Sequence, residues 1–395
     1  MNTKPKLREN IRLQDFILRE DKIRPIIKDP LLMGIKHPGY AVNKETIELL
    51  QLFDGKTSIN EISQLMRHKY NELLTTREIN SVIEKVDRFF LLQNDRYFEH
   101  HANIVSAIGN PIFIDGENVL FPSEKERLLN LIEEQVHNIS GIEFTGKIKG
   151  VIIPHLNAVT SGSLIVRALH KLVSCGFKKF LILGPNHLFH QSRAYLTERD
   201  FQTPLGNVRV MKDKVNKLMS KNSDLFEVNH LLHKHEHSLQ VCFPYLQFLV
   251  GSELEILPIA VSNRHFLDQK QKNPETMRQL ANDIKEVIED DMALIVSGDL
   301  SHYLGDPYKK LSSRVRNNLS EEIKNIDMRI LNHISQGDMD GFYAYSGKVN
   351  YCIFDSLYAG WNIAKLNRGY MIDYYQTKTL EAGNIGTSVA TFLLV

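Results

Sequence analysis

The sequence has few cysteines and no long apolar segment. Its three cysteines, Cys175, Cys242 and Cys352, lie far apart among 395 residues and form neither a CxxC pair nor a disulfide framework, which is typical of a reducing compartment. The most apolar runs, residues 243–250 and 292–296, are too short to span a bilayer. The basic N-terminus leads into no apolar core of signal-peptide length. We therefore predict a cytoplasmic protein with no membrane segment.

An excess of charge of one sign is also absent. The 48 Lys and Arg residues oppose 47 Asp and Glu residues, which gives a formal net charge of +1. No long-range field therefore draws the chain to nucleic acid or to an anionic membrane. With 43% hydrophobic and 24% charged residues, the composition excludes fibrous, low-complexity and wholly disordered proteins. The length exceeds what one core usually needs, so we expect more than one domain.

Residues 25–100 show the periodicity of a small helical unit. Asn43 precedes apolar residues spaced as one helix face, and Ser58 and Thr75 each begin a capping box before another amphipathic segment. Residues 95–98, Asp-Arg-Tyr-Phe, predict a short strand or wing. The apolar positions predict a core made by Ile47, Leu50, Ile62, Leu65, Ile79, Val82 and Val86.

This unit resembles winged-helix domains and PqqD-like peptide-recognition domains. The resemblance rests on three short helices with a wing, and on a Leu-Leu-x-x-Phe-Asp-Gly-Lys-Thr-Ser segment followed by Phe-Phe-Leu-Leu. We assign residues 1–103 to this recognition domain. The balanced charge favours a peptide or protein partner over nucleic acid. Residues 104–147 are predicted to be a connector that contains one helix.

From residue 148 the pattern changes to alternating strands and helices. Continuous apolar runs, typical of buried strands, occur at 151–153, 180–183, 256–261 and 293–296, and residues 387–395 read as a closing strand. Segments with helical spacing lie between them. The pattern predicts an α/β domain over residues 148–395, with a central mixed or mainly parallel sheet flanked by helices.

Three of these strands are followed by a histidine. His155 comes after the first strand, His187 after the second and His302 after the fourth. Ligands bind at the carboxyl ends of the strands in α/β sheets, and imidazole is both a common metal ligand and the usual acid–base group near neutral pH. One such residue alone is more often a loop or core histidine, but three strand ends together indicate a site. Cys352 precedes a predicted helix, where a thiolate is favoured, although a free cysteine is often merely buried.

The run His233-Lys234-His235-Glu236-His237-Ser238 is a further candidate. Its alternating histidines would lie on one face of a strand, as suits a metal site, and Glu236 could pair with a histidine at a helix start. We predict that this run is a loop and that His237 points inward. Cys242 lies on an apolar helix face and is predicted to be a core residue.

The strand-end segments together resemble the MEMO family, called AmmeMemoRadiSam system protein B in bacteria and archaea. The segments that carry the resemblance lie in family order: Pro154-His155 with Thr160-Ser161-Gly162, Leu183-Gly184-Pro185-Asn186-His187, Thr203-Pro204-Leu205-Gly206, Glu236-His237-Ser238 with Phe243-Pro244-Tyr245-Leu246, the run from Val296 to Tyr303, and Cys352. The family's fold is similar to that of class III extradiol dioxygenases, which bind Fe(II) through two histidines and one carboxylate. The resemblance implies a site with metal ligands His155, His187 and Cys352, an acid–base residue His302, and supporting groups Asp299 and His237.

Four positions depart from the family pattern. Asn157 and Ala158 stand where the family has Gly-Tyr, Gln240 replaces a Glu, and Ile353 replaces a Gly. The candidate ligands are kept while their neighbours differ. This indicates either a retained metal site with a different pocket or a site that has moved towards a binding role.

The resemblance implies a metal-dependent redox or oxygenase-like protein. Fe(II) is the expected metal, with Cu or Zn as alternatives, and the substrate is a peptide or a small molecule. The N-terminal domain is expected to recognise a peptide or to dock a partner such as a radical-SAM protein. Two alternatives stay open: a non-catalytic adaptor that binds a peptide or anion in the same pocket, and a zinc hydrolase. The sequence leaves the oligomeric state open.

Overall fold

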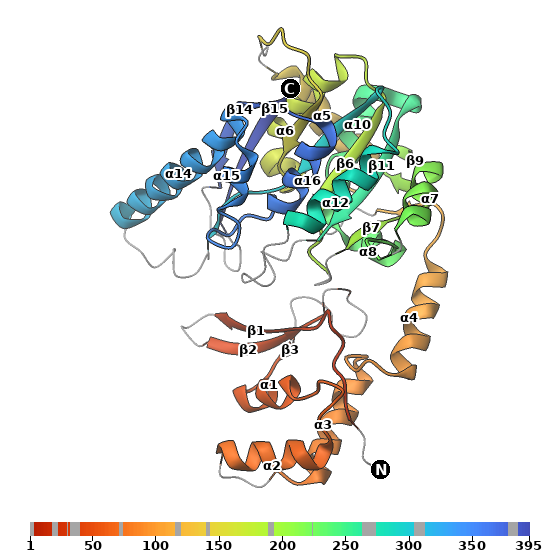
Figure 1. The fold of residues 1–395 in the computed structure, drawn as a ribbon, viewed down its shortest axis with the longest axis vertical. Helices are drawn as coiled ribbons and strands as arrows, with labels where there is room; N and C mark the ends of the chain where they lie inside the picture. Colours follow the sequence, from red (N-terminus) through yellow and green to blue (C-terminus); the bar gives the residue numbers. More distant parts are fainter. Residues whose placement is uncertain are drawn as a thin grey trace. The chain divides into compact units, whose positions relative to one another are not determined.

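The computed structural model divides the chain into two compact units, Met1–Ile108 and Gly109–Val395, shown in Figure 1. Each unit is described by itself. The residues that the structure describes are 4–17, 23–29, 31, 40–70, 74–114, 120–139, 143–188, 193–222, 224–262, 274–303, 313–377 and 386–395.

The described residues of unit 1 form a small antiparallel sheet and four helices. Its strands are β1 (Arg12–Ile17), β2 (Ile23–Lys28) and β3 (Tyr40–Ala41), with β2 in the middle. The helices are α1 (Lys44–Gln51), α2 (Ile59–Tyr70), α3 (Thr76–Arg88) and α4 (Asp95–Ala107). The mainly helical prediction missed this sheet.

Capping residues set the helix starts of unit 1. The Asn43 side chain accepts from the Thr46 N–H and begins α1, and the predicted capping box at Thr75 is formed. Asn94 caps α4 in the same way. The predicted strand or wing at 95–98 is therefore wrong, because a capping residue precedes it and starts a helix.

Most of the predicted apolar core of unit 1 is buried. Ile62 and Ile79 are fully buried at its centre, and Val82 is partly buried against it. Leu65 is the exception, because its side chain is 49% exposed on the outer face of α2. Arg8 and Asp29 form a buried ion pair of 2.7 Å within the same unit.

Unit 2 is built on a twelve-stranded mixed sheet. Its centre is four parallel strands in the order β5-β12-β6-β11, and β15 and β14 extend it in antiparallel fashion beside β5. These strands are β5 (Gly150–Ile153), β6 (Lys179–Pro185), β11 (Glu255–Val261), β12 (Met292–Ser297), β14 (Gly369–Gln376) and β15 (Gly386–Leu394). The α/β fold and the mixed sheet predicted from the sequence are confirmed.

Short strands extend this sheet or pair beside it. They are β4 (Ile112–Phe113), β7 (Ala194–Leu196), β8 (Phe201–Thr203), β9 (Gly206–Val210), β10 (Phe226–Val228) and β13 (His302–Tyr303). The sequence did not indicate them, because segments of two to five residues show no clear period.

Helices cover both faces of the sheet in unit 2 (Figure 1). Helix α16 packs on β6 and β12 and contacts α12, whereas α6 packs on β5 and β15 and contacts α5 and α10. The helices are α5 (Lys125–His137), α6 (Ala158–Val173), α7 (Lys212–Lys221), α8 (His230–His235), α9 (His237–Gln240), α10 (Phe243–Val250), η1 (Gly251–Glu253), α12 (Pro274–Lys285), α14 (Ser313–Gln336), α15 (Met339–Tyr343) and α16 (Phe354–Ala364). Within the described ranges, no helix has the length and apolarity needed to cross a membrane.

Helix α5 is fixed to α6 and α10 by one buried amide. Gln135 donates from Nε2 to the Ala158 carbonyl at 2.8 Å, and its Oε1 accepts from the Tyr245 hydroxyl at 2.9 Å. A Cβ on Gly162 would lie 2.2 Å from that hydroxyl, so the glycine makes room for the bridge. The helix predicted within the connector thus packs as part of unit 2.

Candidate metal centre

Three histidines converge at the carboxyl ends of the parallel strands. His155 follows β5, His187 follows β6, and His237 begins α9. One ligand atom from each lies within 4.8 Å of the others. The ring centroids are 5.2 Å apart for His155 and His187, 5.1 Å for His155 and His237, and 4.8 Å for His187 and His237.

The Glu236 carboxylate supports two of these rings. Its Oε1 lies 2.9 Å from His187 Nδ1 and 3.4 Å from His237 Nδ1, and its Oε2 accepts from the His187 backbone N–H at 2.7 Å. Burial alone would raise the pKa of Glu236, but the charge and hydrogen bonds of His187 outweigh it and lower the pKa below its ordinary value. With Nδ1 held by a carboxylate, Nε2 is the ring nitrogen of His187 that can bind a metal. Sequence reasoning assigned Glu236 no role beyond that of a pairing partner for a histidine.

His155 is the deepest of the three residues. Its Nδ1 lies 3.2 Å from Ser297 Oγ, and its Nε2 lies 3.5 Å from both Cys352 Sγ and Asp299 Oδ2. Burial and the neighbouring histidines hold the pKa of His155 well below its ordinary value, so the ring stays neutral, as a metal ligand must be.

Asp299 and Cys352 hold each other beside His155. Asp299 Oδ1 accepts from the His155 backbone N–H at 3.0 Å, and the Asp299 backbone N–H donates to Cys352 Sγ at 3.1 Å. Burial raises the pKa of Asp299 to about 7. Burial, and then the Asp299 charge, raise the pKa of the Cys352 thiol well above its ordinary value. The expected lowering of this pKa by the start of α16 does not outweigh burial, so the thiol stays protonated until a cation displaces its proton.

His302 lies at the rim of this group. Its Nδ1 is 2.9 Å from the Asn350 carbonyl oxygen, and its backbone N–H donates to the same oxygen at 3.2 Å. A carbonyl can only accept, so His302 Nδ1 carries the proton and Nε2 is the basic nitrogen. Desolvation lowers the pKa of His302.

The donor set suits a transition metal. Metal–nitrogen bonds are about 2.0–2.1 Å, so two imidazole nitrogens on one ion lie roughly 3 Å apart, and a limit of 4.8 Å between the three donors needs only small side-chain movements. The His187 ring has its Nδ1 held by Glu236 at 2.9 Å, which is the usual support for a metal-binding histidine, and the same carboxylate lies 3.4 Å from His237 Nδ1. Cys352 Sγ is within 3.5 Å of His155, so a thiolate is a fourth possible donor.

The structure therefore brings all six sequence-predicted site residues into one region. The three donors closest to one another are His155, His187 and His237, whereas the family resemblance implied Cys352 as the third ligand; that ligand set stays a prediction. The predicted loop at 233–238 is wrong, because residues 233–235 belong to α8, which Asn229 caps, and residues 237–238 begin α9.

The four departures from the family pattern have local structural roles. Asn157 caps α6 by accepting from the Thr160 N–H at 2.8 Å, and Ala158 is fully buried. Gln240 donates to the His233 carbonyl at 2.7 Å, which a glutamate carboxylate could not do. Ile353 fills the space beside Gly298, where a Cβ would lie 2.4 Å from the Ile353 Cβ.

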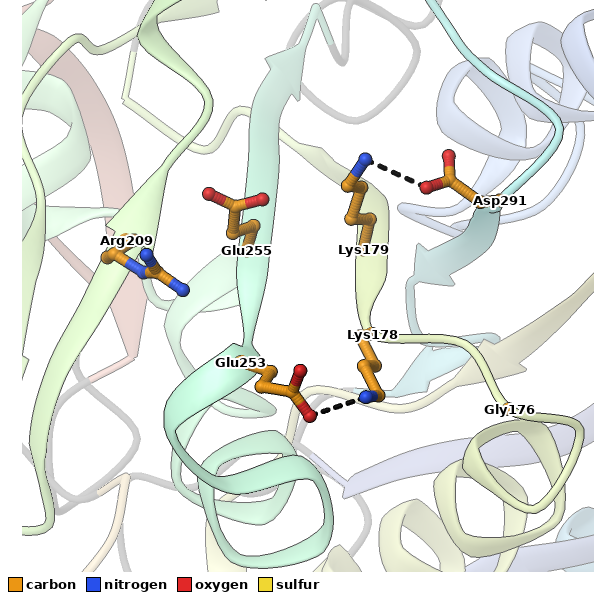
Figure 2. Close-up of a pocket in the computed structure, with 7 residues that line it drawn as sticks. All are labelled: Gly176, Lys178, Lys179, Arg209, Glu253, Glu255 and Asp291. Carbon is orange, nitrogen blue, oxygen red and sulfur yellow. Dashed lines mark hydrogen bonds and ion pairs between the residues drawn. The ribbon is translucent and has the colours of Figure 1, made fainter.

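A charged pocket lies at the other ends of the same strands. The cavity has a volume of ≈ 330 Å³ and is lined by Gly176, Lys178, Lys179, Arg209, Glu253, Glu255 and Asp291. Figure 2 shows Lys178 paired with Glu253, and Lys179 paired with Asp291 at 2.8 Å. None of the predicted site residues lines it.

Comparison with known proteins shows the family of the chain. A family model described as "Memo-like protein" matches residues 118–388. A "MEMO1 family protein" of Aquifex aeolicus is 28% identical over 331 residues, covering 81% of this chain and 83% of that protein. One of Pyrococcus abyssi is 30% identical over 229 residues, covering 56% of this chain and 76% of that protein. One of Thermoplasma volcanium is 26% identical over 227 residues, covering 56% of this chain and 74% of that protein. The chain belongs to the Memo-like protein family.

Proposed function

We propose that this protein binds a redox-active metal ion, Fe(II) or copper, at the histidine cluster and acts as an oxygenase-like redox enzyme on a peptide or small molecule. The observation that carries the proposal is the convergence of His155, His187 and His237, with the Glu236 carboxylate bonded to His187 Nδ1 and 3.4 Å from His237 Nδ1. Bound there, the metal supplies open coordination positions for substrate and oxidant.

The chain's own residues divide the remaining work. Glu236 orients His187 and fixes which of its nitrogens is available, and Asp299 positions His155 through its backbone N–H. His302, whose basic nitrogen is Nε2, is suited to take up a proton from substrate at the rim of the site. The His237 side chain is 42% exposed, so the site is open to solvent on that side and substrate can approach there.

An anion-binding adaptor is the weaker alternative. Two buried carboxyl groups, Glu236 and Asp299, line the cluster, and the lowered pKa of His155 keeps its ring uncharged. A carboxylate or phosphate ligand would meet repulsion from Glu236 and little compensating positive charge. A cation would instead be attracted by the Glu236 carboxylate. Zinc hydrolysis uses the same donors, so the metal found in the protein decides between it and redox chemistry.

Metal content of the full chain tests the proposal. Protein purified without oxygen and without chelators should retain about one equivalent of metal, and the chelator-treated protein should bind added Co²⁺ with visible absorption bands. His302→Ala should keep metal content near that of wild type while any turnover is lost, because His302 is not a proposed ligand. A wild-type chain that binds no divalent ion at micromolar concentration would refute the metal centre.

Proton release distinguishes the two ligand sets. At pH 8.5 ordinary imidazoles are neutral and bind a metal without losing a proton, whereas the buried Cys352 thiol must lose one. Co²⁺ binding measured by calorimetry in buffers of different ionisation enthalpy should release about one proton if Cys352 ligates. Cys352→Ser should abolish that release. No release from wild type would favour the set His155, His187 and His237.

We further propose that unit 1 recognises a peptide or docks a protein partner, for which a radical-SAM protein is one candidate, and that the protein works in the cytoplasm. The small net charge and the resemblance to PqqD-like domains support the first part. The similarity to the Aquifex protein covers 81% of the chain, which is more than unit 2 alone contains, so it extends into unit 1. Salt-sensitive DNA binding by the full chain would argue against this role.

A further inference from the structure

Asp327 on α14 is a fully buried carboxylate outside the candidate metal centre. Four hydroxyl groups surround it. Its Oδ1 accepts from Ser301 Oγ at 2.7 Å and from Tyr351 Oη at 2.5 Å. Its Oδ2 accepts from Tyr374 Oη at 2.7 Å and from Ser388 Oγ at 2.5 Å. An ionised carboxylate has about four lone-pair sites, so the four hydroxyls saturate it.

The two carboxylate oxygens serve different parts of the fold. The Oδ2 partners, Tyr374 and Ser388, lie on the paired strands β14 and β15. The Oδ1 partners lie on the two segments that carry candidate site residues: Ser301 stands directly before His302, and Tyr351 directly before Cys352. One oxygen thus faces the sheet, and the other faces the site.

Those two segments depend on each other for their position. The His302 N–H donates to the Asn350 carbonyl at 3.2 Å, and the Cys352 N–H donates to the Asp299 carbonyl at 3.2 Å. The 299–302 segment is also paired with β15, because the Leu300 N–H donates to the Ser388 carbonyl and the Ser388 N–H donates to the Ser301 carbonyl, each at 2.9 Å. Within the described part of the chain, Asp327 Oδ1 is the one atom that receives a side-chain bond from each segment. On its other side β15 is paired with β14.

We propose that Asp327 is a positioning residue that holds the 350–352 segment in register with the 299–302 segment, which is paired with β15, and so places Cys352 beside Asp299, His302 and the histidine cluster. The expected effect on metal binding rests on the proposed function. The expected effect on the position of Cys352 does not depend on whether a metal binds. If Asp327 only stabilised the fold, the loss of any one of its four hydroxyl bonds would affect the site equally.

Four single variants of the full chain separate these two roles. Tyr351→Phe and Ser301→Ala remove the site-side bonds, and Tyr374→Phe and Ser388→Ala are their chemically matched sheet-side controls. Each removes one hydroxyl bond to the same carboxylate, so similar losses of stability are expected within each matched pair. The first readout is the rate at which Cys352 reacts with iodoacetamide, followed by peptide mass spectrometry with the exposed Cys175 as internal reference. The second readout is Co²⁺ affinity.

We expect the site-side variants to raise the Cys352 reaction rate about tenfold and to weaken Co²⁺ binding about tenfold, which matches the loss of one hydrogen bond to a charged group. The sheet-side variants should change each by less than about twofold. Equal changes in all four variants at equal loss of stability would overturn the proposal and leave Asp327 a structural residue. If wild type binds no Co²⁺, the metal centre fails, but the Cys352 rates still decide the role of Asp327. Asp327→Asn keeps the shape and one oxygen; if it fails to fold, the four single variants suffice.

Discussion

The two ends of the parallel strands in unit 2 hold titratable groups in opposite ways. At the amino ends, cations and carboxylates pair with one another in solvent around an open cavity, as Lys178 does with Glu253. At the carboxyl ends, the buried Glu236 carboxylate lies against two of the three clustered histidines, His187 and His237, and the third, His155, lies against Asp299. The charges at the first end are paired with their neighbours, whereas the second end brings together three imidazole donors, where we propose that a cation binds. The cavity therefore marks the less reactive end of the sheet.

The largest difference between the two ends is expected when one histidine of the cluster is removed. His187→Ala should weaken Co²⁺ binding by about 150-fold, because four-ligand zinc sites bind with about 10–16 kcal/mol and each ligand is then worth roughly 3 kcal/mol. Lys179→Ala, at the amino end of the same strand β6, is the matched control and should leave the affinity unchanged. Titration followed by absorption measures both. Equal affinities for wild type and His187→Ala would move the metal site elsewhere.

Burial, rather than charge alone, should govern the pH dependence of stability. His233 is buried, its Nε2 donates to the Tyr195 carbonyl at 3.0 Å, and burial lowers its pKa to about 4. Below about pH 6.5 the unfolded chain takes up a proton that the folded chain refuses until about pH 4, so stability falls as the pH falls through this window. The loss attributable to His233 should reach about 3 kcal/mol at pH 4.

Urea unfolding at pH 7 and at pH 4.5 tests this effect. His233→Gln does not titrate, so its stability should fall less than that of wild type between the two pH values. His170→Gln, at an exposed position of α6, should behave as wild type does. Parallel losses in all three proteins would show that His233 is not kept neutral by the fold.

Loss of the Glu236 charge should weaken Co²⁺ binding less than loss of a ligand does. It should weaken binding more than any substitution at the amino ends of the strands. Glu236→Gln keeps the shape and removes the charge, and we expect Co²⁺ affinity to fall about 10–100-fold. Glu253→Gln, which removes a carboxylate charge from the amino-end pocket, should have no effect on affinity. An unchanged affinity in Glu236→Gln would mean that the rings are oriented by packing alone.

The smallest effect is expected at the exposed ion pair. Lys178 and Glu253 are 53% and 63% exposed, and such pairs contribute about 0–1 kcal/mol. Lys178→Ala should therefore lower the free energy of unfolding by less than about 1 kcal/mol, measured by urea titration. A larger loss would show that the amino-end pairs act as a network and would weaken the contrast between the two ends.

The sequence was informative where position along the chain decides position in space. His155 and His187 follow buried apolar strands of a parallel sheet, and the carboxyl ends of such strands meet at one edge, so their convergence could be predicted. The buried strands themselves were visible as continuous apolar runs. The capping box at Thr75 was likewise a local signal, and the structure confirms it.

What the sequence missed depends on long-range contacts. Glu236 stands next to His237 in the chain, but its bond to His187 joins residues 49 positions apart, and only the Glu-His-Ser segment hinted at it. The four hydroxyls around Asp327 come from four separate segments, so no spacing signals them. Leu65 was predicted to be a core residue because it has helical spacing, but it lies on the exposed face of α2. A strand or wing was predicted at residues 95–98 because Asn94 was overlooked as the capping residue of a helix.

The bridge made by Gln135 sets where unit 2 can be cut without harm. A polypeptide beginning at residue 148 would lack α5, so the Ala158 carbonyl and the Tyr245 hydroxyl would lose their shared partner, and Gly162 would lose its contact with the Gln135 amide. Ala158 is the first residue of α6 and stands three residues after His155, and Tyr245 lies on α10. A polypeptide beginning at Gly109 keeps the amide, and also keeps β4 paired with β8. The residues between Gly109 and β5 therefore belong to unit 2. A fusion or truncation boundary should be placed before Gly109.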